Sequence, residues 1–439
     1  MLGRKPPSLA ILGALLLASS LHAEIKVLKN FTLIDGTGRT PVAESAMIID
    51  NGHITWIGRT PQLKTPAGAE IVDLTGKFVM PGIINLHGHI GNTVDLTQDA
   101  KFYTRKSIEE NLHTYASYGV TTVQSMGTDQ DLIFQVRNEQ RAGRPSAARV
   151  YSAGTGFVFK DGYGGLAGVT PGYSRVEDIE PAVAKLAAQK VDIVKLWLDD
   201  ELGQYPKMPP AMSQAIIEST RKHGLREVSH IFYLEDAKRV VEQGAAGLAH
   251  SVRDKPVDQM LIDSMKKRGA WQMAATLSRE ASMFVYGQTP PFIKDPFFTR
   301  SVSQTTLQLL ASPERQKTIA EAAHFKEYPA FLETAKKNLK KLADSGVKYG
   351  FGTDTGPPGR FPGYGEHWEL ELMVEAGLTP MQTLTAATRS GAEFLGARDL
   401  GTLEVTKWAD LIVLNANPLS NIKNTRSIHS VYIAGNLVK

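Results

Sequence analysis

Two closely spaced histidines are the first residues of this chain that could do metal chemistry. His87 and His89 are two residues apart at the end of an apolar run, 83–86. Because alternate residues of a β-strand face the same side, both imidazoles can reach one ion. On its own, however, the pair is equally consistent with two ordinary polar histidines.

Three further candidates end other apolar runs. His230 lies in the run 227–231, His250 ends the run 247–250, and Asp354 follows the last run, 348–353. If the runs are strands of one barrel, their carboxyl ends present these side chains at the same rim. Neutral imidazoles and a carboxylate there could bind metal ions.

Lys195 is unusual because it puts a cation inside the apolar run 191–197. A buried and unpaired ammonium is costly. One interpretation is a lysine that reaches the surface or pairs with Asp199, Asp200 or Glu201. The other is a lysine whose neutral amine has reacted with carbon dioxide, so that the resulting carbamate bridges two metals.

The elements that must position these residues repeat from Val79 onward. Short β-branched and apolar runs alternate with helix-patterned segments, which is typical of βα units and a parallel sheet. Eight such units predict an α/β fold, a (β/α)8 TIM barrel with its reactive end where the strands finish. The expected strands are 83–87, 120–125, 149–153, 192–197, 227–231, 247–250, 270–275 and 348–353.

The two ends of the chain have a different pattern. Residues 24–78 and 401–439 contain short strands and turn signals without long helical periodicity. We expect them to meet in one small composite β-sandwich domain beside a barrel of residues 79–400. Two insertions, 154–173 and 277–341, are candidate lids and specificity loops.

Residues 1–23 have the pattern of a cleaved signal peptide, with Arg4 and Lys5 before an apolar stretch and a cleavage site at Ala23. The alternative is an uncleaved membrane anchor, but the apolar stretch is shorter than the about 20 residues that cross a bilayer. Export to the periplasm or medium is therefore expected, with no stable membrane span after cleavage. The chain has no cysteine. A formal charge of +4 predicts no nucleic-acid partner, and the sequence is compatible with a homo-oligomer.

Together these motifs resemble the amidohydrolase superfamily, in its branch of prolidase-like and imidazolonepropionase-like hydrolases. The resemblance covers almost all of the mature chain. One departure is Asn85, where the family usually has Asp. The motifs are His87-Gly88-His89 after 80–84, the strand lysine, two histidines one βα unit apart, Gly352-Thr353-Asp354, and the segments 369–380 and 409–414.

The resemblance implies two divalent metal ions, with zinc expected first. It implies these ligands: His87, His89 and Asp354 for the first ion, His230 and His250 for the second, and carboxylated Lys195 as the bridge. The ions would lower the pKa of a bridging water and polarise the substrate carbonyl. Asp354 would accept the proton of the water and pass it to the leaving nitrogen.

The expected activity is hydrolysis of an amide or peptide-like C–N bond in a small-molecule substrate such as a dipeptide, an Xaa-Pro-like compound or an N-acyl amino acid. Tyr233 and His367 are candidate substrate contacts, with packing as the alternative for Tyr233. Arg279 and Arg300 could hold a substrate carboxylate. A lactonase or phosphotriesterase with the same metals, a single-metal deaminase-like site, and a metal-free binding relative stay open as alternatives.

Overall fold

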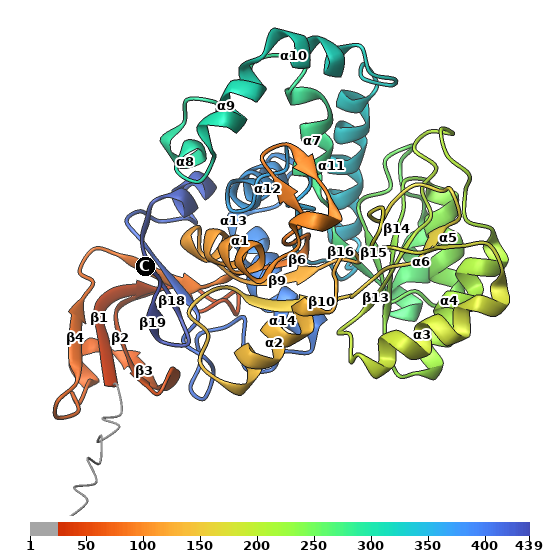
Figure 1. Ribbon diagram of the computed structural model, residues 1–439. Helices are drawn as coiled ribbons and strands as arrows, with labels where there is room; N and C mark the ends of the chain where they lie inside the picture. The colour runs from red at the N-terminus through yellow and green to blue at the C-terminus, as the bar shows by residue number, and fades with distance from the viewer. Residues whose placement is uncertain (1–24) are drawn as a thin grey trace, which may run out of the picture.

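The computed structural model describes residues 25–439 of the chain (Figure 1). The expected signal peptide, residues 1–23, lies outside the described residues. Within residues 25–439, no helix is both long enough and apolar enough to cross a bilayer.

Two parallel sheets form the centre of the molecule. The first has the order β10 (Arg149–Ser152), β9 (Val120–Ser125), β6 (Ile83–Gly88). The second has the order β13 (Val194–Trp197), β14 (Glu227–His230), β15 (Gly247–Ala249), β16 (Trp271–Ala274). Every residue of all these strands except β10 is buried, as expected of parallel strands with both faces covered.

Backbone hydrogen bonds join the two sheets at both of their seams. At one seam, the N–H of Asp192, just before β13, donates to the carbonyl of Ser152 in β10 at 2.9 Å. At the other, the segment 348–353 lies between β16 and β6: its Gly350 N–H donates to the Gln272 carbonyl at 3.0 Å, and the Leu86 N–H donates to the Phe351 carbonyl at 2.9 Å. This eighth segment forms one isolated bridge, from Tyr349 to Gln272, and not a regular strand.

Helices follow the strands and cover their outer faces (Figure 1). They are α1 (Arg105–Ser117), α2 (Leu132–Ala142), α3 (Ile179–Ala188), α4 (Pro210–Lys222), α5 (Leu234–Gln243) and α6 (Gln259–Arg268). In α5 the buried residues Leu234, Ala237 and Val241 recur at helical spacing, and the helix ends at Gly244, whose φ of 104° is left-handed. The side chain of Asp258 caps α6 by accepting from the Leu261 N–H.

The insertion after β16 is helical and lies over one end of the molecule (Figure 1). It comprises α7 (Leu277–Val285), α8 (Pro296–Thr299), α9 (Gln304–Ala311), α10 (Pro313–Ala320) and α11 (Tyr328–Asp344). Phe292 and Phe298 pack edge-on at 4.9 Å, and Phe298 packs in the same way on Phe361 at 5.0 Å. These aromatic contacts attach the insertion to the loop that follows Asp354. The chain continues through α12 (Tyr364–Glu375), α13 (Pro380–Thr385) and α14 (Gly391–Leu395).

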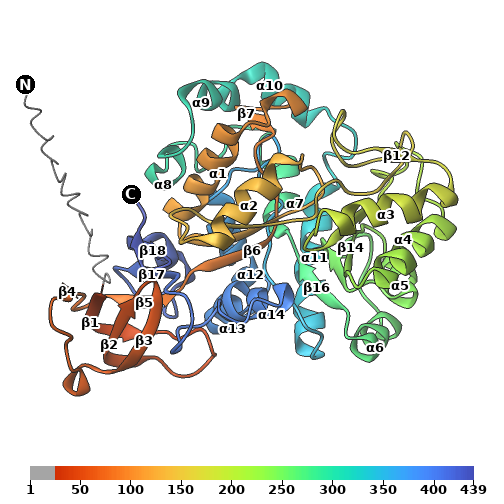
Figure 2. The same cartoon turned by 60° about the horizontal axis from the view of Figure 1, so that its bottom comes forward.

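The two ends of the chain meet in one mixed eight-stranded sheet (Figure 2). Its strands are β1 (Ile25–Leu33), β2 (Val42–Asp50), β3 (His53–Arg59), β4 (Glu70–Asp73), β5 (Phe78–Pro81), β17 (Leu411–Leu414), β18 (Ile428–Ile433) and β19 (Asn436–Leu437). β17 runs antiparallel to β5, with Leu411 opposite Pro81 and Leu414 opposite Phe78. The strands of the expected β-sandwich domain are connected in one hydrogen-bonded sheet, because β5 pairs with both β1 and β17.

Candidate metal centre and substrate cavity

His87, His89 and Asp354 form a compact buried group where β6 and the segment 348–353 end. Nε2 of His89 lies 2.9 Å and Nε2 of His87 lies 3.4 Å from Oδ1 of Asp354. Within residues 25–439, this is the one set of three or more candidate ligands whose donor atoms all lie within 4.8 Å of one another. Two imidazole nitrogens and a carboxylate oxygen are a donor set that zinc binds.

Asn85 supports the backbone beneath this group. Its Oδ1 accepts from the N–H groups of His87 at 2.9 Å and Thr353 at 3.3 Å, and its Nδ2 donates to Oε1 of Glu366 at 2.7 Å. The buried amide therefore ties β6 to the last strand segment. Asp354 has a left-handed backbone with a φ of 61°, which costs free energy and must be held by such surroundings.

His250 presents a free ring nitrogen beside this group. Its Nδ1 lies 2.7 Å from Oγ1 of Thr276, whereas its Nε2 is buried without a hydrogen-bond partner. An unpaired buried nitrogen is costly, so this atom suits a position that faces a metal ion. The centre of the His250 ring lies 4.1 Å from the centre of the His230 ring and 4.8 Å from that of the His87 ring.

His230 offers its other ring nitrogen. Its Nε2 lies 3.0 Å from Oδ2 of Asp199, which leaves Nδ1 as the donor available to a metal. Burial lowers the pKa of His230 to about 4 and holds that of His250 well below its usual value. Both rings are therefore neutral near pH 7, the form in which imidazole binds metals.

Lys195 lies beside His87, and its charge also contributes to the lowered pKa values of His230 and His250. Its Nζ lies 3.3 Å from Nε2 of His87 and 5.0 Å from the centre of the Trp197 ring. Burial lowers the pKa of Lys195 to about 7, so a neutral amine is accessible near neutral pH.

The acidic residues just after Lys195 have other partners. Asp199 faces His230, Asp200 accepts from the hydroxyl of Tyr233 at 2.7 Å, and Glu201 accepts from that of Tyr328 at 3.0 Å. Among the ion pairs within residues 25–439, none joins Lys195 to these carboxylates. Pairing with its acidic neighbours therefore does not account for the burial of Lys195.

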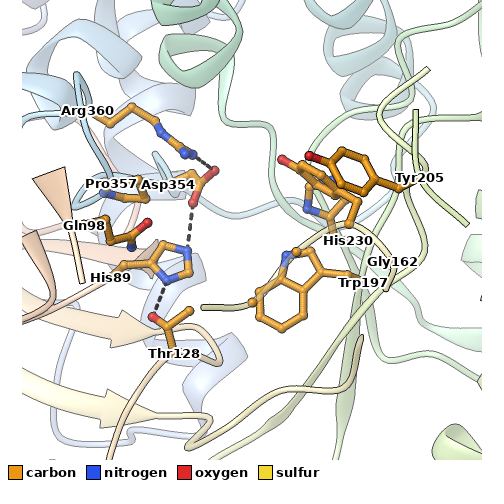
Figure 3. A pocket seen from close by; sticks show the side chains of 13 residues that line it. His89, Gln98, Thr128, Gly162, Trp197, Tyr205, His230, Asp354, Pro357 and Arg360 are labelled. Atoms are coloured by element: carbon orange, nitrogen blue, oxygen red, sulfur yellow. Dashed lines mark hydrogen bonds and ion pairs between the residues drawn. The ribbon is translucent and has the colours of Figure 1, made fainter. Parts of the chain in front are cut away.

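A cavity of about 340 Å³ opens beside these ligands. Figure 3 shows His89, Asp354 and Arg360 on one side of it and His230, Trp197 and Tyr205 on the other. Arg360 forms a short ion pair with Oδ2 of Asp354, and Arg279 places its Nε 3.8 Å from the same oxygen. The cavity thus combines the candidate ligands with cationic and aromatic walls.

The glycines of the loop 154–173 make room for the Trp197 wall. A Cβ atom at Gly156 would lie 2.2 Å from Cζ3 of Trp197, and one at Gly164 would lie 2.3 Å from its Cγ. A Cβ atom at Gly127, which lies outside the loop, would lie 2.6 Å from Cη2 of Trp197. Real side chains do not approach so closely, so the indole requires glycine at all three positions.

The structure does not bring the two predicted substrate contacts to the cavity wall. The hydroxyl of Tyr233 is engaged by Asp200. His367 is fully buried, with Nδ1 2.9 Å from Oγ1 of Thr425 and Nε2 2.8 Å from the carbonyl of Tyr118. Arg300 stacks on Tyr118, with its guanidinium 3.6 Å from the ring centre. These contacts give His367 and Arg300 packing roles.

Three residues at the site were not predicted from the sequence as functional residues: Asp199, Trp197 and Arg360. Trp197 had a usable signal, because it lies two residues after Lys195 and so on the same face of the strand. Arg360 follows Asp354 by six residues, in the loop after the last strand segment, where barrel enzymes place functional groups. Asp199 had no signal of its own, because its contact with His230 depends on the pairing of β13 with β14.

Comparisons with known proteins find relatives over almost the whole chain. A model of the Amidohydrolase family matches residues 78–438. The imidazolonepropionase of Deinococcus radiodurans is 24% identical over 427 residues, covering 90% of this chain and 92% of the relative. That of Streptomyces griseus is 22% identical over 407 residues, with the same coverage of both chains.

Solved structures share the fold. A putative prolidase from Bifidobacterium longum superposes with a TM-score of 0.73 at 24% identity, covering 94% of each chain. A Xaa-Pro dipeptidase with methionine bound in its active site superposes with a TM-score of 0.72 at 20% identity, covering 94% of this chain and 99% of the other. The shared architecture is a TIM-barrel-type α/β fold.

Proposed function

Because the chain belongs to the amidohydrolase family, we propose that it hydrolyses an amide or peptide-like C–N bond in a small substrate that carries a carboxylate. Dipeptides, Xaa-Pro-like compounds and N-acyl amino acids are the substrates that we expect. The observation that carries the proposal is the meeting of two groups of candidate ligands at one cavity with an arginine on its wall.

The donor atoms fit two divalent ions, with zinc as the first choice. The first would be held by His87, His89 and Asp354, the second by Nδ1 of His230 and Nε2 of His250, and carboxylated Lys195 would bridge them. When bound, such ions lower the pKa of a water molecule and polarise a substrate carbonyl.

Asp354 is the residue that we assign to proton transfer. Burial raises the pKa of its carboxyl, but Arg360 and the two neighbouring histidines outweigh burial and hold the pKa well below its usual value. The carboxylate is therefore ionised and able to accept the proton of the attacking water. Delivery of this proton to the leaving nitrogen would complete C–N cleavage.

The cavity walls favour a substrate with one anionic and one apolar end. The guanidinium of Arg360 can donate two parallel hydrogen bonds to a carboxylate. Trp197 and Tyr205 offer ring faces on the opposite side, suited to a proline ring or another flat apolar group (Figure 3). A cavity of about 340 Å³ lies at the small end of ligand pockets, which suits a compound of dipeptide size.

A panel of substrates can distinguish amide hydrolysis from lactone or phosphotriester hydrolysis by the same metal centre. The protein, reconstituted with zinc and bicarbonate, would be assayed on dipeptides, N-acyl amino acids, lactones and an aryl phosphotriester. We expect hydrolysis of the amides. Strong esterase activity without amide hydrolysis would favour the lactonase or phosphotriesterase alternative, and fewer than one metal ion per chain would refute the dinuclear centre.

Export is part of the same proposal, since the first 23 residues have the pattern of a signal peptide. N-terminal sequencing of the protein recovered from its native host should begin at Glu24. An N-terminus at Met1 would contradict cleavage.

A further inference from the structure

A row of buried charged side chains connects His230 with Asp354. Asp199, Arg253, Glu280 and Arg279 are each at most 3% exposed. Oδ2 of Asp199 lies 3.7 Å from Arg253, Nε of Arg253 lies 3.1 Å from Oε1 of Glu280, and this oxygen lies 2.6 Å from Nη1 of Arg279. We call these four residues the buried charge row.

Stability alone is a weak explanation for this row. Moving charges out of water costs several kcal/mol for each ion, and apolar replacements of buried ion pairs are often neutral or stabilising. The row ends on candidate metal ligands at both sides, since Arg279 lies 3.8 Å from Asp354 and Asp199 lies 3.0 Å from His230. Positioning of those ligands is therefore the more direct explanation.

We propose that Asp199 is a positioning residue that selects the ring tautomer of His230, an inference that rests on the dinuclear centre of the proposed function. Oδ1 of Asp199 accepts from the backbone N–H of Glu201 at 3.0 Å, so Oδ2 is the oxygen that faces Nε2 of His230. An ionised carboxylate only accepts hydrogen bonds. Nε2 must therefore carry the ring hydrogen, which leaves the lone pair of Nδ1 for the second metal.

The neighbouring histidines lack this restraint. Nδ1 of His89 and Nδ1 of His250 each face a threonine hydroxyl, that of Thr128 at 2.9 Å and that of Thr276 at 2.7 Å. A hydroxyl can rotate to donate or to accept, so it fits either tautomer. Asp199 imposes a tautomer, whereas the two hydroxyls adapt to one.

This geometry makes an unusual prediction for the isosteric amide. In Asp199→Asn, Oδ1 would keep the Glu201 N–H, and Nδ2 would then point its hydrogens at Nε2 of His230. Nε2 would have to accept, the ring hydrogen would move to Nδ1, and the metal position would be blocked. If the side-chain amide of Asp199→Asn were flipped, its hydrogens would face the N–H of Glu201, and two donors would oppose each other. Asp199→Ala leaves space for water, which can donate or accept, so its effect should be milder.

Equilibrium dialysis of zinc against the metal-free proteins in bicarbonate buffer tests whether Asp199→Asn weakens metal binding more than Asp199→Ala does. We expect two ions in the wild type. The affinity for the second ion should fall about 10- to 100-fold in Asp199→Asn and less in Asp199→Ala, with the first ion unaffected. The matched control is Asp200→Asn, which should keep both ions because Asp200 contacts Tyr233 and the backbone of Gly203.

The outcomes separate the inference from the proposed function. A wild-type protein that takes up only one ion would refute the dinuclear centre and this inference with it. Two ions in the wild type, together with an Asp199→Asn variant that binds as well as Asp199→Ala or better, would refute the inference alone.

A second measurement needs no change at Asp199. Ring ¹⁵N shifts of the metal-free wild type at pH 8, assigned with His230→Gln, should place the hydrogen of His230 on Nε2. A hydrogen on Nδ1 would overturn the proposal even if the Asp199 variants did not fold.

Discussion

Replacement of Lys195 by methionine should stabilise the metal-free protein, although it removes a residue that we assign to the centre. Lys195 is fully buried, and burial lowers its pKa from 10.5 to about 7. Methionine has a similar length and no charge to bury. The variant therefore removes an electrostatic cost and keeps most of the packing.

The magnitude follows from the difference in proton affinity between the folded and unfolded chains. The unfolded lysine binds its proton more tightly, and each pKa unit is worth about 1.4 kcal/mol. At pH 7 the buried amine therefore costs about 4 kcal/mol of folding free energy. This cost is largest below pH 7, shrinks as the pH rises through the window from about 7 to 10.5, and is below about 1 kcal/mol at pH 10.

Calorimetry of the metal-free proteins in degassed buffer provides the assay. For a chain of this length, about 4 kcal/mol corresponds to a melting temperature about 4 °C higher for Lys195→Met at pH 7. The difference in melting temperature between the variant and the wild type should nearly disappear at pH 10. Lys64→Met, at an exposed loop position, is the matched control and should show no such pH dependence. A gap of equal size at both pH values would refute the argument that desolvation of the ammonium sets the cost.

Three further predictions concern the cavity. Asp354→Asn should lower kcat about 10²- to 10⁴-fold while metal analysis still finds most of the metal bound, and substantial residual turnover would remove Asp354 from proton transfer. Arg360→Met should raise KM for N-acyl amino acids about 10- to 100-fold, and equal changes for carboxamide analogues would argue against a carboxylate contact. Gly156→Ala would place a Cβ 2.2 Å from Trp197 and should lower the free energy of unfolding by about 1 to 3 kcal/mol. The control is Gly143→Ala, whose Cβ has its nearest neighbour at 3.6 Å, and equal melting temperatures of the two variants would contradict the packing argument.

Local patterns predicted most of the barrel strands because these strands are short runs of apolar or β-branched residues between helix-patterned segments. The strand expected at 120–125 has the bounds of β9, and the other six that form strands differ by a residue or two at their ends. The segment 348–353 is the exception. A Cβ at Gly350 would lie 2.6 Å from Leu86, and one at Gly352 would lie 2.7 Å from Ala274. Glycine permits these close approaches, but the segment forms a single bridge where a regular strand was expected.

The candidate ligands could be predicted because each lies at or near the end of a recognisable apolar run. Their supporting residues could not, because those contacts join distant parts of the chain. Asp199 reaches His230 only when β13 and β14 lie side by side. Arg253 meets Glu280 only when the loop after β15 approaches α7. A pattern within one segment carries no information about such pairs.

The terminal sheet has a consequence for the order in which the protein can fold. Pro81 in β5 pairs with Leu411 in β17, so a ribosome that has made β5 must add most of the chain before the partner strand exists. At about 5 to 20 residues per second, this delay is roughly 20 to 60 seconds. During that time one edge of β5 is an unsatisfied strand edge, open to chaperones or to pairing with other chains. Most barrel strands meet their neighbours after much shorter delays, but β6 must wait for the segment 348–353, to which the bond from Leu86 to Phe351 joins it. Because β17 and β18 are made later still, their docking onto the terminal sheet should be the last step of folding.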